Sequence, residues 1–219
     1  MHRRRRTVLV LSAALAAAAP VLTACGNDAH PGAAAVVGDQ QITVAQLENR
    51  VNEVRAAQRA AIADDAQYQQ VVAQSGGLTR DTLHSMVLDR VIDRAVQDAG
   101  VTVSRKEVQT FRSTLEQQAG GAKALETAWL QRYGVAPQYL DDSLRTEIEA
   151  QKLGTVLGAD MNTEAGKATF WKALSEASGK LDVDLNPRYG TWNVEESTLD
   201  DAKTPWLRKI TPEAQPRTA

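Results

Sequence analysis

Few side chains in this sequence have the types and spacing that catalysis requires. The 219 residues contain three histidines and a single cysteine, Cys25. A serine or cysteine nucleophile needs a positioned base, and His84 is the only histidine that falls within a predicted helix. Four residues after it stands Leu88 rather than an acid that could orient the imidazole. We interpret His84 as a structural or surface histidine and predict no catalytic residue.

Metal and cofactor sites are not indicated either. One cysteine is too few for a cysteine-rich zinc or iron–sulfur site. The adjacent acids Asp64-Asp65, Asp141-Asp142 and Asp200-Asp201 diverge on a helix, whereas metal ligands must converge. The glycine pairs Gly76-Gly77 and Gly120-Gly121 lack the spacing of a phosphate-binding loop. We expect no metal, no cofactor and no enzymatic activity.

Cys25 has a specific chemistry because of what precedes it. A basic stretch, Met1 to Arg6, leads into the apolar run Thr7 to Leu22, which is short for a bilayer span and typical of a signal peptide. The run ends in Leu22-Thr23-Ala24-Cys25, which resembles the bacterial lipobox. We expect cleavage after residue 24 and acylation of the Cys25 thiol, with acyl chains such as palmitate holding the protein on the membrane. The general and twin-arginine export routes both remain open.

The signal peptide and the lipobox place the mature protein, by expectation, on the extracytoplasmic face of the cell membrane, and its composition is that of a globular protein. The chain is 43% hydrophobic and 24% charged, the balance of an ordinary globular protein. Its net charge of −2 includes Arg3 to Arg6 in the signal peptide, so the mature chain is more acidic. A surface without a basic stripe is a poor match for phosphates, and we expect no nucleic acid partner.

Four parts follow one another along the chain. We predict a signal peptide over residues 1–24, a lipidated tether over 25–33, a folded domain over 34–192, and an extended or disordered tail over 193–219. The domain begins with two short extended pieces around Val36 and Ile42, joined at Gly38-Asp39.

Helices fill most of the domain. Thr43 with Gln46 and Ser104 with Glu107 form capping boxes that predict two helix starts. Thr79 is expected to cap a central helix whose apolar face is too wide for a surface helix. The predicted helices cover approximately residues 43–63, 66–74, 79–99, 104–119, 137–157 and 163–178, with a further short helix that carries Leu125, Ala128 and Trp129 and is closed by Gly134.

A single strand follows the last helix. Leu181, Val183 and Leu185 alternate with aspartates, the period of a half-buried strand. Its backbone polar groups need partners, and the extended pieces near Val36 and Ile42 are the candidates. The predicted fold class is mainly α, a helical domain with a small sheet formed by N-terminal extended segments and a C-terminal strand.

This organisation resembles the SurA and PrsA family of extracytoplasmic chaperones and foldases, some of which are lipoproteins. The resemblance rests on Val36-Val37-Gly38-Asp39 leading into a helix, and on Val183-Asp184-Leu185 followed by Asn186-Pro187. It covers about residues 34–192 and implies the helical domain of the SurA N-terminus. Family members carry parvulin prolyl isomerase domains of about a hundred residues, and the few residues between 159 and 163 leave no room for one.

The resemblance implies a chaperone-like binder, a holdase, of unfolded or newly exported proteins without prolyl isomerase activity. Tyr189 and Trp192 are candidates for client contact beside an apolar groove between the helices and the sheet, with core packing as the alternative. An interaction subunit that docks on one cell-envelope partner is the second hypothesis, and an enzyme, including a cryptic isomerase, is the third.

Overall fold

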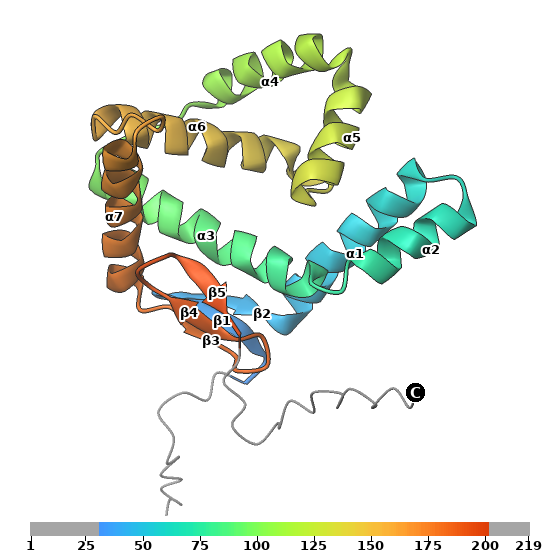
Figure 1. The fold of residues 1–219 in the computed structure, drawn as a ribbon, viewed down its shortest axis with the longest axis horizontal. Helices are drawn as coiled ribbons and strands as arrows, with labels where there is room; N and C mark the ends of the chain where they lie inside the picture. The colour runs from blue at the N-terminus through green and yellow to red at the C-terminus, as the bar shows by residue number, and fades with distance from the viewer. Residues whose placement is uncertain (1–30, 202–219) are drawn as a thin grey trace, which may run out of the picture.

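The computed structural model describes residues 31–201 (Figure 1). Within this range the chain is mainly helical, with seven α-helices and two small antiparallel sheets. None of the described helices is both long and apolar enough to cross a membrane. The elements are, in chain order, β1 (Ala33–Val37), β2 (Gln40–Thr43), α1 (Val44–Ala61), α2 (Asp65–Gln74), α3 (Leu78–Asp98), α4 (Arg105–Ala119), α5 (Ala122–Tyr133), the 3-10 turn η1 (Pro137–Tyr139), α6 (Leu140–Val156), α7 (Glu164–Leu181), β3 (Asp184–Leu185), β4 (Thr191–Asn193) and β5 (Thr198–Asp200).

Two of the three predicted N-caps form as expected. Thr43 accepts a hydrogen bond from the Gln46 amide while the Gln46 side chain accepts from the Thr43 amide, and Ser104 and Glu107 do the same at α4. The cap predicted at Thr79 is wrong. α3 begins at Leu78 with Gly77 as its N-cap and no side-chain hydrogen bond, so Thr79 is the second residue of the helix rather than its N-cap.

The two ends of the domain meet in one sheet, as predicted. The strand order is β2-β1-β3, with β1 antiparallel to both neighbours and Val36 opposite both Gln41 and Asp184. Gly38 makes the turn between β1 and β2 with φ +61°, a left-handed conformation that favours glycine. Its amide also donates to the Leu181 carbonyl at 2.6 Å, which ties this turn to the end of α7.

α3 is the central helix. It lies between the sheet on one side and α4, α5 and α6 on the other, with α7 across one end and α1 and α2 at the other (Figure 1). Leu83, Val87 and Val91 on α3 are fully buried and join the main core with β1, α1 and α7. A second, smaller cluster lies between α4, α5 and α6 around Leu125 and Leu144.

The C-terminal part differs from the prediction in two ways. α7 continues to Leu181, and Asp182 follows in a left-handed conformation with φ 46°, so the alternating segment yields only the two-residue strand β3. Part of the range 193–219, which was expected to be a tail, instead folds. β4 and β5 form an antiparallel hairpin in which Trp192 lies opposite Leu199, and Arg80 of α3 donates to Asp201 at 2.5 Å and to the Asp200 carbonyl at 3.2 Å.

Candidate functional site

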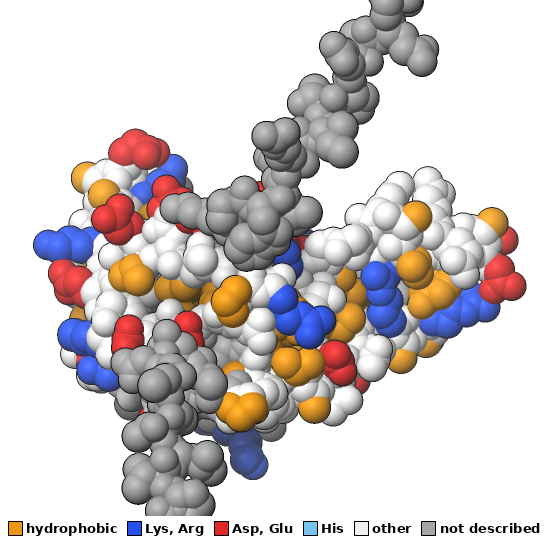
Figure 2. Space-filling model, turned by 90° about the horizontal axis from the view of Figure 1, so that it is seen from below, with side chains coloured by type: hydrophobic (Ala, Val, Ile, Leu, Met, Phe, Trp, Pro, Cys, Tyr) orange, Lys and Arg blue, Asp and Glu red, His pale blue; other side chains and the backbone are white. Residues whose placement is uncertain are grey.

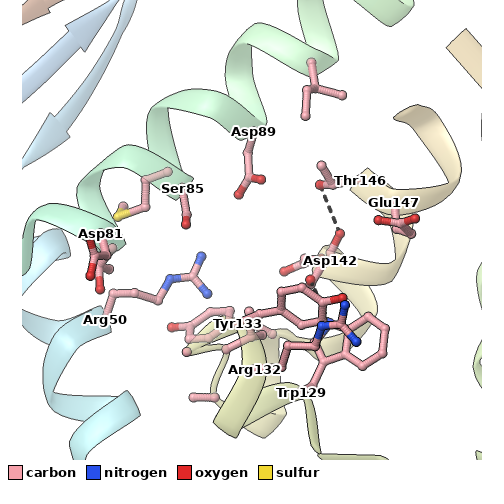
Figure 3. Close-up of a pocket in the computed structure, with 18 of the residues that line it drawn as sticks. Arg50, Asp81, Ser85, Asp89, Trp129, Arg132, Tyr133, Asp142, Thr146 and Glu147 are labelled. Atoms are coloured by element: carbon pink, nitrogen blue, oxygen red, sulfur yellow. Dashed lines mark hydrogen bonds between the residues drawn. The ribbon is translucent and has the colours of Figure 1, made fainter. Parts of the chain in front are cut away.

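A cleft of about 550 Å³ is lined by residues of α3 on the face opposite to the buried Leu83 and Val87. Its walls come from α1, α3, α5, the segment through η1, and α6 (Figure 3). This cleft lies between helices, whereas the expected groove was one between the helices and the sheet. On the sheet-side face seen in Figure 2, hydrophobic side chains lie in small groups among polar and charged ones.

The polar stripe of α3 forms one wall. Asp81, Ser85 and Asp89 line the cleft at steps of four residues, so they share one face of the helix. The opposite face carries Leu83 and Val87, which are buried in the core. Because the core fixes the rotation of α3, the acids of this stripe turn toward the cleft.

Aromatic rings form the facing wall. Trp129 and Tyr133, one turn apart on α5, have ring centroids 4.9 Å apart. The Trp129 indole donates a hydrogen bond to the Ser143 hydroxyl of α6 at 3.0 Å, which fixes its orientation. Tyr133 is 50% exposed and leaves an accessible apolar surface at the cleft edge.

Arg50 of α1 reaches into the cleft beside these rings (Figure 3). Its guanidinium carbon lies 3.2 Å from the centroid of the Tyr139 ring, a cation–π contact. The Tyr139 hydroxyl donates to Glu53 at 2.5 Å, and this bond, together with burial, raises the pKa of the Tyr139 phenol. Tyr139 is thereby held between two residues of α1.

Acidic side chains outnumber basic ones in the lining. Asp81 and Asp89 lie on α3 and Asp142 and Glu147 on α6, against the guanidinium groups of Arg50 and Arg132. Burial raises the pKa of Asp89 to about 6, an effect that the charge of Arg50 partly opposes. Within residues 31–201, none of the four carboxylates takes part in an ion pair.

A further acid lies where α3 packs on α6. Glu149 is 7% exposed, and its Oε2 atom has no hydrogen-bond partner. Burial, the charge of Asp93 and a hydrogen bond with Asp93 raise the pKa of Glu149 to about 7. The charged form of Glu149 is therefore disfavoured where α3 packs on α6.

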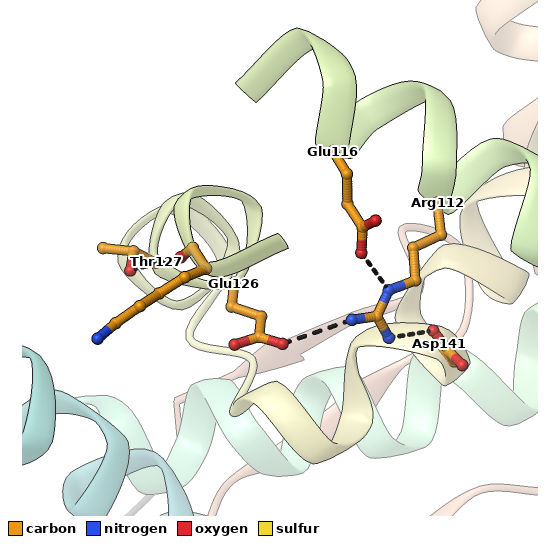
Figure 4. Close-up of polar contacts among 6 residues, drawn as sticks. Arg112, Glu116, Glu126, Thr127 and Asp141 are labelled. Atoms are coloured by element: carbon orange, nitrogen blue, oxygen red, sulfur yellow. Dashed lines mark hydrogen bonds and ion pairs between the residues drawn. The ribbon is translucent and has the colours of Figure 1, made fainter. Parts of the chain in front are cut away.

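One arginine holds the outer helices together (Figure 4). Arg112 of α4 donates to Glu116 on its own helix at 2.7 Å, to Glu126 of α5 at 3.4 Å and to Asp141 of α6 at 2.8 Å. The planar guanidinium has enough donors for all three carboxylates. This network keeps α5, and hence the aromatic wall, in place against α6.

His84, the one histidine within the described residues, lies outside the cleft. The His84 ring lies 3.1 Å from the Ser197 carbonyl through Nε2 and 5.8 Å from the Trp192 ring, which fits the structural role predicted for it. Within residues 31–201, no group of three or more His, Cys, Asp or Glu side chains is placed to hold a metal ion. A cleft that offers rings, methylene groups and charges can bind a flexible chain through contacts of low specificity.

The structure places the predicted site residues away from this cleft. Tyr189 is 6% exposed in the main core, and Trp192 is half-buried with its indole donating to Ser178 at 2.6 Å. These positions favour core packing over an exposed aromatic surface, and contact of either residue with a client stays a prediction. The lipobox residues Leu22, Thr23, Ala24 and Cys25 lie outside the described residues.

Sequence reasoning missed the cleft itself. The polar stripe Asp81, Ser85 and Asp89 on a helix predicted to be central was the available signal, because polar side chains at four-residue steps on a buried helix need a reason. The partners of that stripe come from three other helices, and their positions follow from helix packing rather than from local sequence.

Comparison with known proteins gives one match. A family model described as the SurA-like N-terminal domain matches residues 1–154, which reach from the first residue into α6. No parvulin domain was detected. No curated protein and no solved structure matches the chain.

Proposed function

The chain belongs to the family of SurA-like N-terminal domains, and from this premise we propose that it is a membrane-anchored extracytoplasmic lipoprotein that holds unfolded or newly exported proteins without isomerising their prolyl bonds. The family domain is a non-catalytic chaperone domain, and such domains are extracytoplasmic. The proposal adds the anchor, the class of client and the lack of isomerase activity.

The observation that carries the proposal is the cleft between α1, α3, α5 and α6. It is open to solvent along Tyr133, which is 50% exposed, and it combines rings with the flexible side chain of Met86. Methionine and aromatic side chains adapt to many apolar partners. A holdase needs such a surface because its clients differ in sequence.

The position of α7 supports a domain without an inserted isomerase. α6 ends at Val156 and α7 begins at Glu164, while a parvulin domain needs about a hundred residues for its own core. The described chain passes directly from one helix to the next at the point where the family carries its insertion.

The spacing at the N-terminus supports an anchor close to the membrane. β1 begins at Ala33, so only residues 26–32 separate the proposed acylated Cys25 from the first strand. Two acyl chains on one cysteine would hold the domain stably, since one chain alone binds a bilayer only marginally.

The activity is tested by suppression of aggregation. A chemically denatured, aggregation-prone client is diluted into buffer that contains the full-length protein at near-equimolar ratio. Aggregation of the client is then followed by light scattering. We expect strong suppression by the parent protein, weaker suppression by Tyr133→Ser in the cleft, and full suppression by Met161→Ser, which removes a 45% exposed side chain elsewhere. Absence of suppression by the parent protein contradicts the proposal.

A second candidate function is docking on one folded partner in the cell envelope. It is favoured by the exposed side chains of Val156 and Met161, at 61% and 45%, near the passage from α6 to α7. Crosslinking in cells separates the two functions. Recovery of one folded partner through Met161 favours docking, and recovery of many unfolded chains through Tyr133 favours the holdase.

A further inference from the structure

The charges of the cleft define the class of chain that it accepts. We infer that the cleft binds extended segments in which Lys or Arg side chains stand next to aromatic or aliphatic ones, in preference to neutral or acidic segments of the same apolarity. This inference rests on the proposed function and names its client class.

Carboxylates that form no ion pair within residues 31–201 lie on both long walls, and Glu147 accepts one hydrogen bond, from Gln151 at 2.9 Å. Asp81 and Asp89 belong to α3, and Asp142 and Glu147 belong to α6, which faces it. A segment between these helices has carboxylates on two sides. Charge complementarity of this kind selects partners and speeds their encounter more than it raises the maximal affinity.

The two arginines of the cleft offset only part of this field, because Arg50 and Arg132 face four carboxylates, Asp81, Asp89, Asp142 and Glu147. Arg50 stacks on Tyr139 at 3.2 Å, and the guanidinium of Arg132 lies 5.3 Å from the centroid of the Tyr133 ring. Each guanidinium thus covers an aromatic face of the cleft. These contacts also show that rings of this wall accept a cation, so a client arginine has the same kind of surface available.

The half-buried Asp89 has the most to gain from a bound cation. Burial is the largest influence on its carboxylate and penalises the charged form. Opposite charge close to a buried carboxylate favours ionisation. A Lys or Arg side chain placed beside Asp89 would therefore offset part of the burial penalty on its charged form.

The spacing of the two acids in the polar stripe of α3 sets the length of the client segment that can contact both. Asp81 and Asp89 are eight positions apart on α3, which is about 12 Å along the helix axis. An extended chain covers this distance in about four residues. Leu78, Met86 and Ile92 line the same wall, so apolar and cationic side chains in one short segment both find partners.

The test uses three labelled peptides that differ only in charge. Each contains two aromatic and two leucine residues, and two further central positions are Lys, Gln or Glu. Fluorescence anisotropy with the full-length protein is expected to give about fivefold tighter binding of the Lys peptide than of the Gln peptide, with the Glu peptide weakest. The difference should shrink when the salt concentration rises from 50 mM to 500 mM, because salt screens exposed charges.

A pair of double variants locates the effect. Asp142→Asn with Glu147→Gln removes two charges from the cleft, and Glu48→Gln with Glu195→Gln removes two exposed charges that do not line it. We expect the preference for Lys over Gln to fall to less than twofold in the first and to stay unchanged in the second. Circular dichroism of both verifies that the fold is kept.

The outcomes separate this inference from the proposed function. Equal binding of all three peptides, or a preference that survives the cleft substitutions, overturns the inference while suppression of aggregation still supports the holdase. Failure to bind any peptide together with failure to suppress aggregation overturns both. Residues 202–219 include Trp206-Leu207-Arg208-Lys209, so binding that occurs only after their removal would assign the cleft to the protein's own C-terminal segment and overturn the inference.

Discussion

Ala35 in β1 lies opposite Leu185 in β3, and this antiparallel pair joins the first strand of the described chain to the segment that follows its last long helix. The Asn186 amide extends the contact by donating to the Ala34 carbonyl at 3.0 Å. The sheet closes the helical domain and gives α3 a fixed surface to pack on. Leu83, Val87 and Val91 of α3 share the main core with this sheet, on the side of the helix opposite to the acids of the cleft.

Removal of the Leu185 side chain should destabilise the whole domain. Leu185 is 7% exposed in the main core, so Leu185→Ala is expected to lower the free energy of unfolding by about 2–4 kcal/mol in urea titrations. Val194→Ala is the matched control, since Val194 is 39% exposed and should cost less than about 0.5 kcal/mol. Equal effects of the two substitutions would contradict the role given to the sheet.

Loss of Arg112 should loosen the outer helices. Its three carboxylate partners lie on α4, α5 and α6, and we expect Arg112→Ala to cost about 1–2 kcal/mol and to speed hydrogen exchange in α4 and α5. Arg112→Lys should rescue little, because an ammonium group cannot reproduce the planar fork. Arg94→Ala, which removes one exposed pair with Asp98, is the control and should cost about 0.3–0.5 kcal/mol. Unchanged exchange in α5 would refute this role of Arg112.

The stability of the domain should fall as the pH rises toward neutrality. In the unfolded chain Glu149 loses its proton near its ordinary pKa of 4.5, whereas its pKa in the folded domain is about 7. Between these values the folded state binds more protons, so the free energy of unfolding decreases with increasing pH. The raised pKa of Asp89, about 6, acts in the same direction.

Substitution of Glu149 tests this origin of the pH dependence. The Glu149→Gln variant cannot ionise at this position. Between pH 4.5 and 7 its free energy of unfolding should therefore fall less than that of the parent protein, by on the order of 2 kcal/mol. Glu176→Gln, at an exposed position of α7, is the control and should leave the pH dependence of the free energy of unfolding unchanged. A parent protein whose stability rises over this pH range would show that the buried carboxyl group does not control the pH dependence.

Cys25 should decide where the protein is found. Cys25→Ser cannot form the thioether to a diacylglyceryl group, so we expect the parent protein in the membrane fraction and the variant either in the soluble extracytoplasmic fraction or retained with an uncleaved leader. Mass spectrometry of the parent should show an acylated N-terminal cysteine. An unmodified Cys25 in the purified parent protein would disprove the lipid anchor.

Features that depend on residues close together in the sequence were predicted most easily. The caps at Thr43 and Ser104 are local, and both form. The pairing of β3 with β1 is distant, but the unpaired backbone of a single strand left few partners, and this prediction is confirmed.

The β4–β5 hairpin and the cleft were not predicted, because both depend on residues that lie far apart in the sequence or carry too short a pattern. The hairpin of β4 and β5 has one inward pair, Trp192 and Leu199, which is too little alternation to predict two strands. The cleft draws its walls from four helices, and the crossing of those helices follows from side-chain packing over the whole domain. Neither feature has a signature within a short window of sequence.

The central claim, that unfolded chains bind in the cleft between α3, α5 and α6, is tested most directly by site-specific photo-crosslinking. A photoreactive amino acid replaces Tyr133 at the cleft edge in one variant and Met161, also exposed, in another, and each is irradiated with a denatured client. The account predicts strong crosslinking through position 133 and little through position 161. Crosslinking that is equal at both positions, or concentrated at 161, would contradict it.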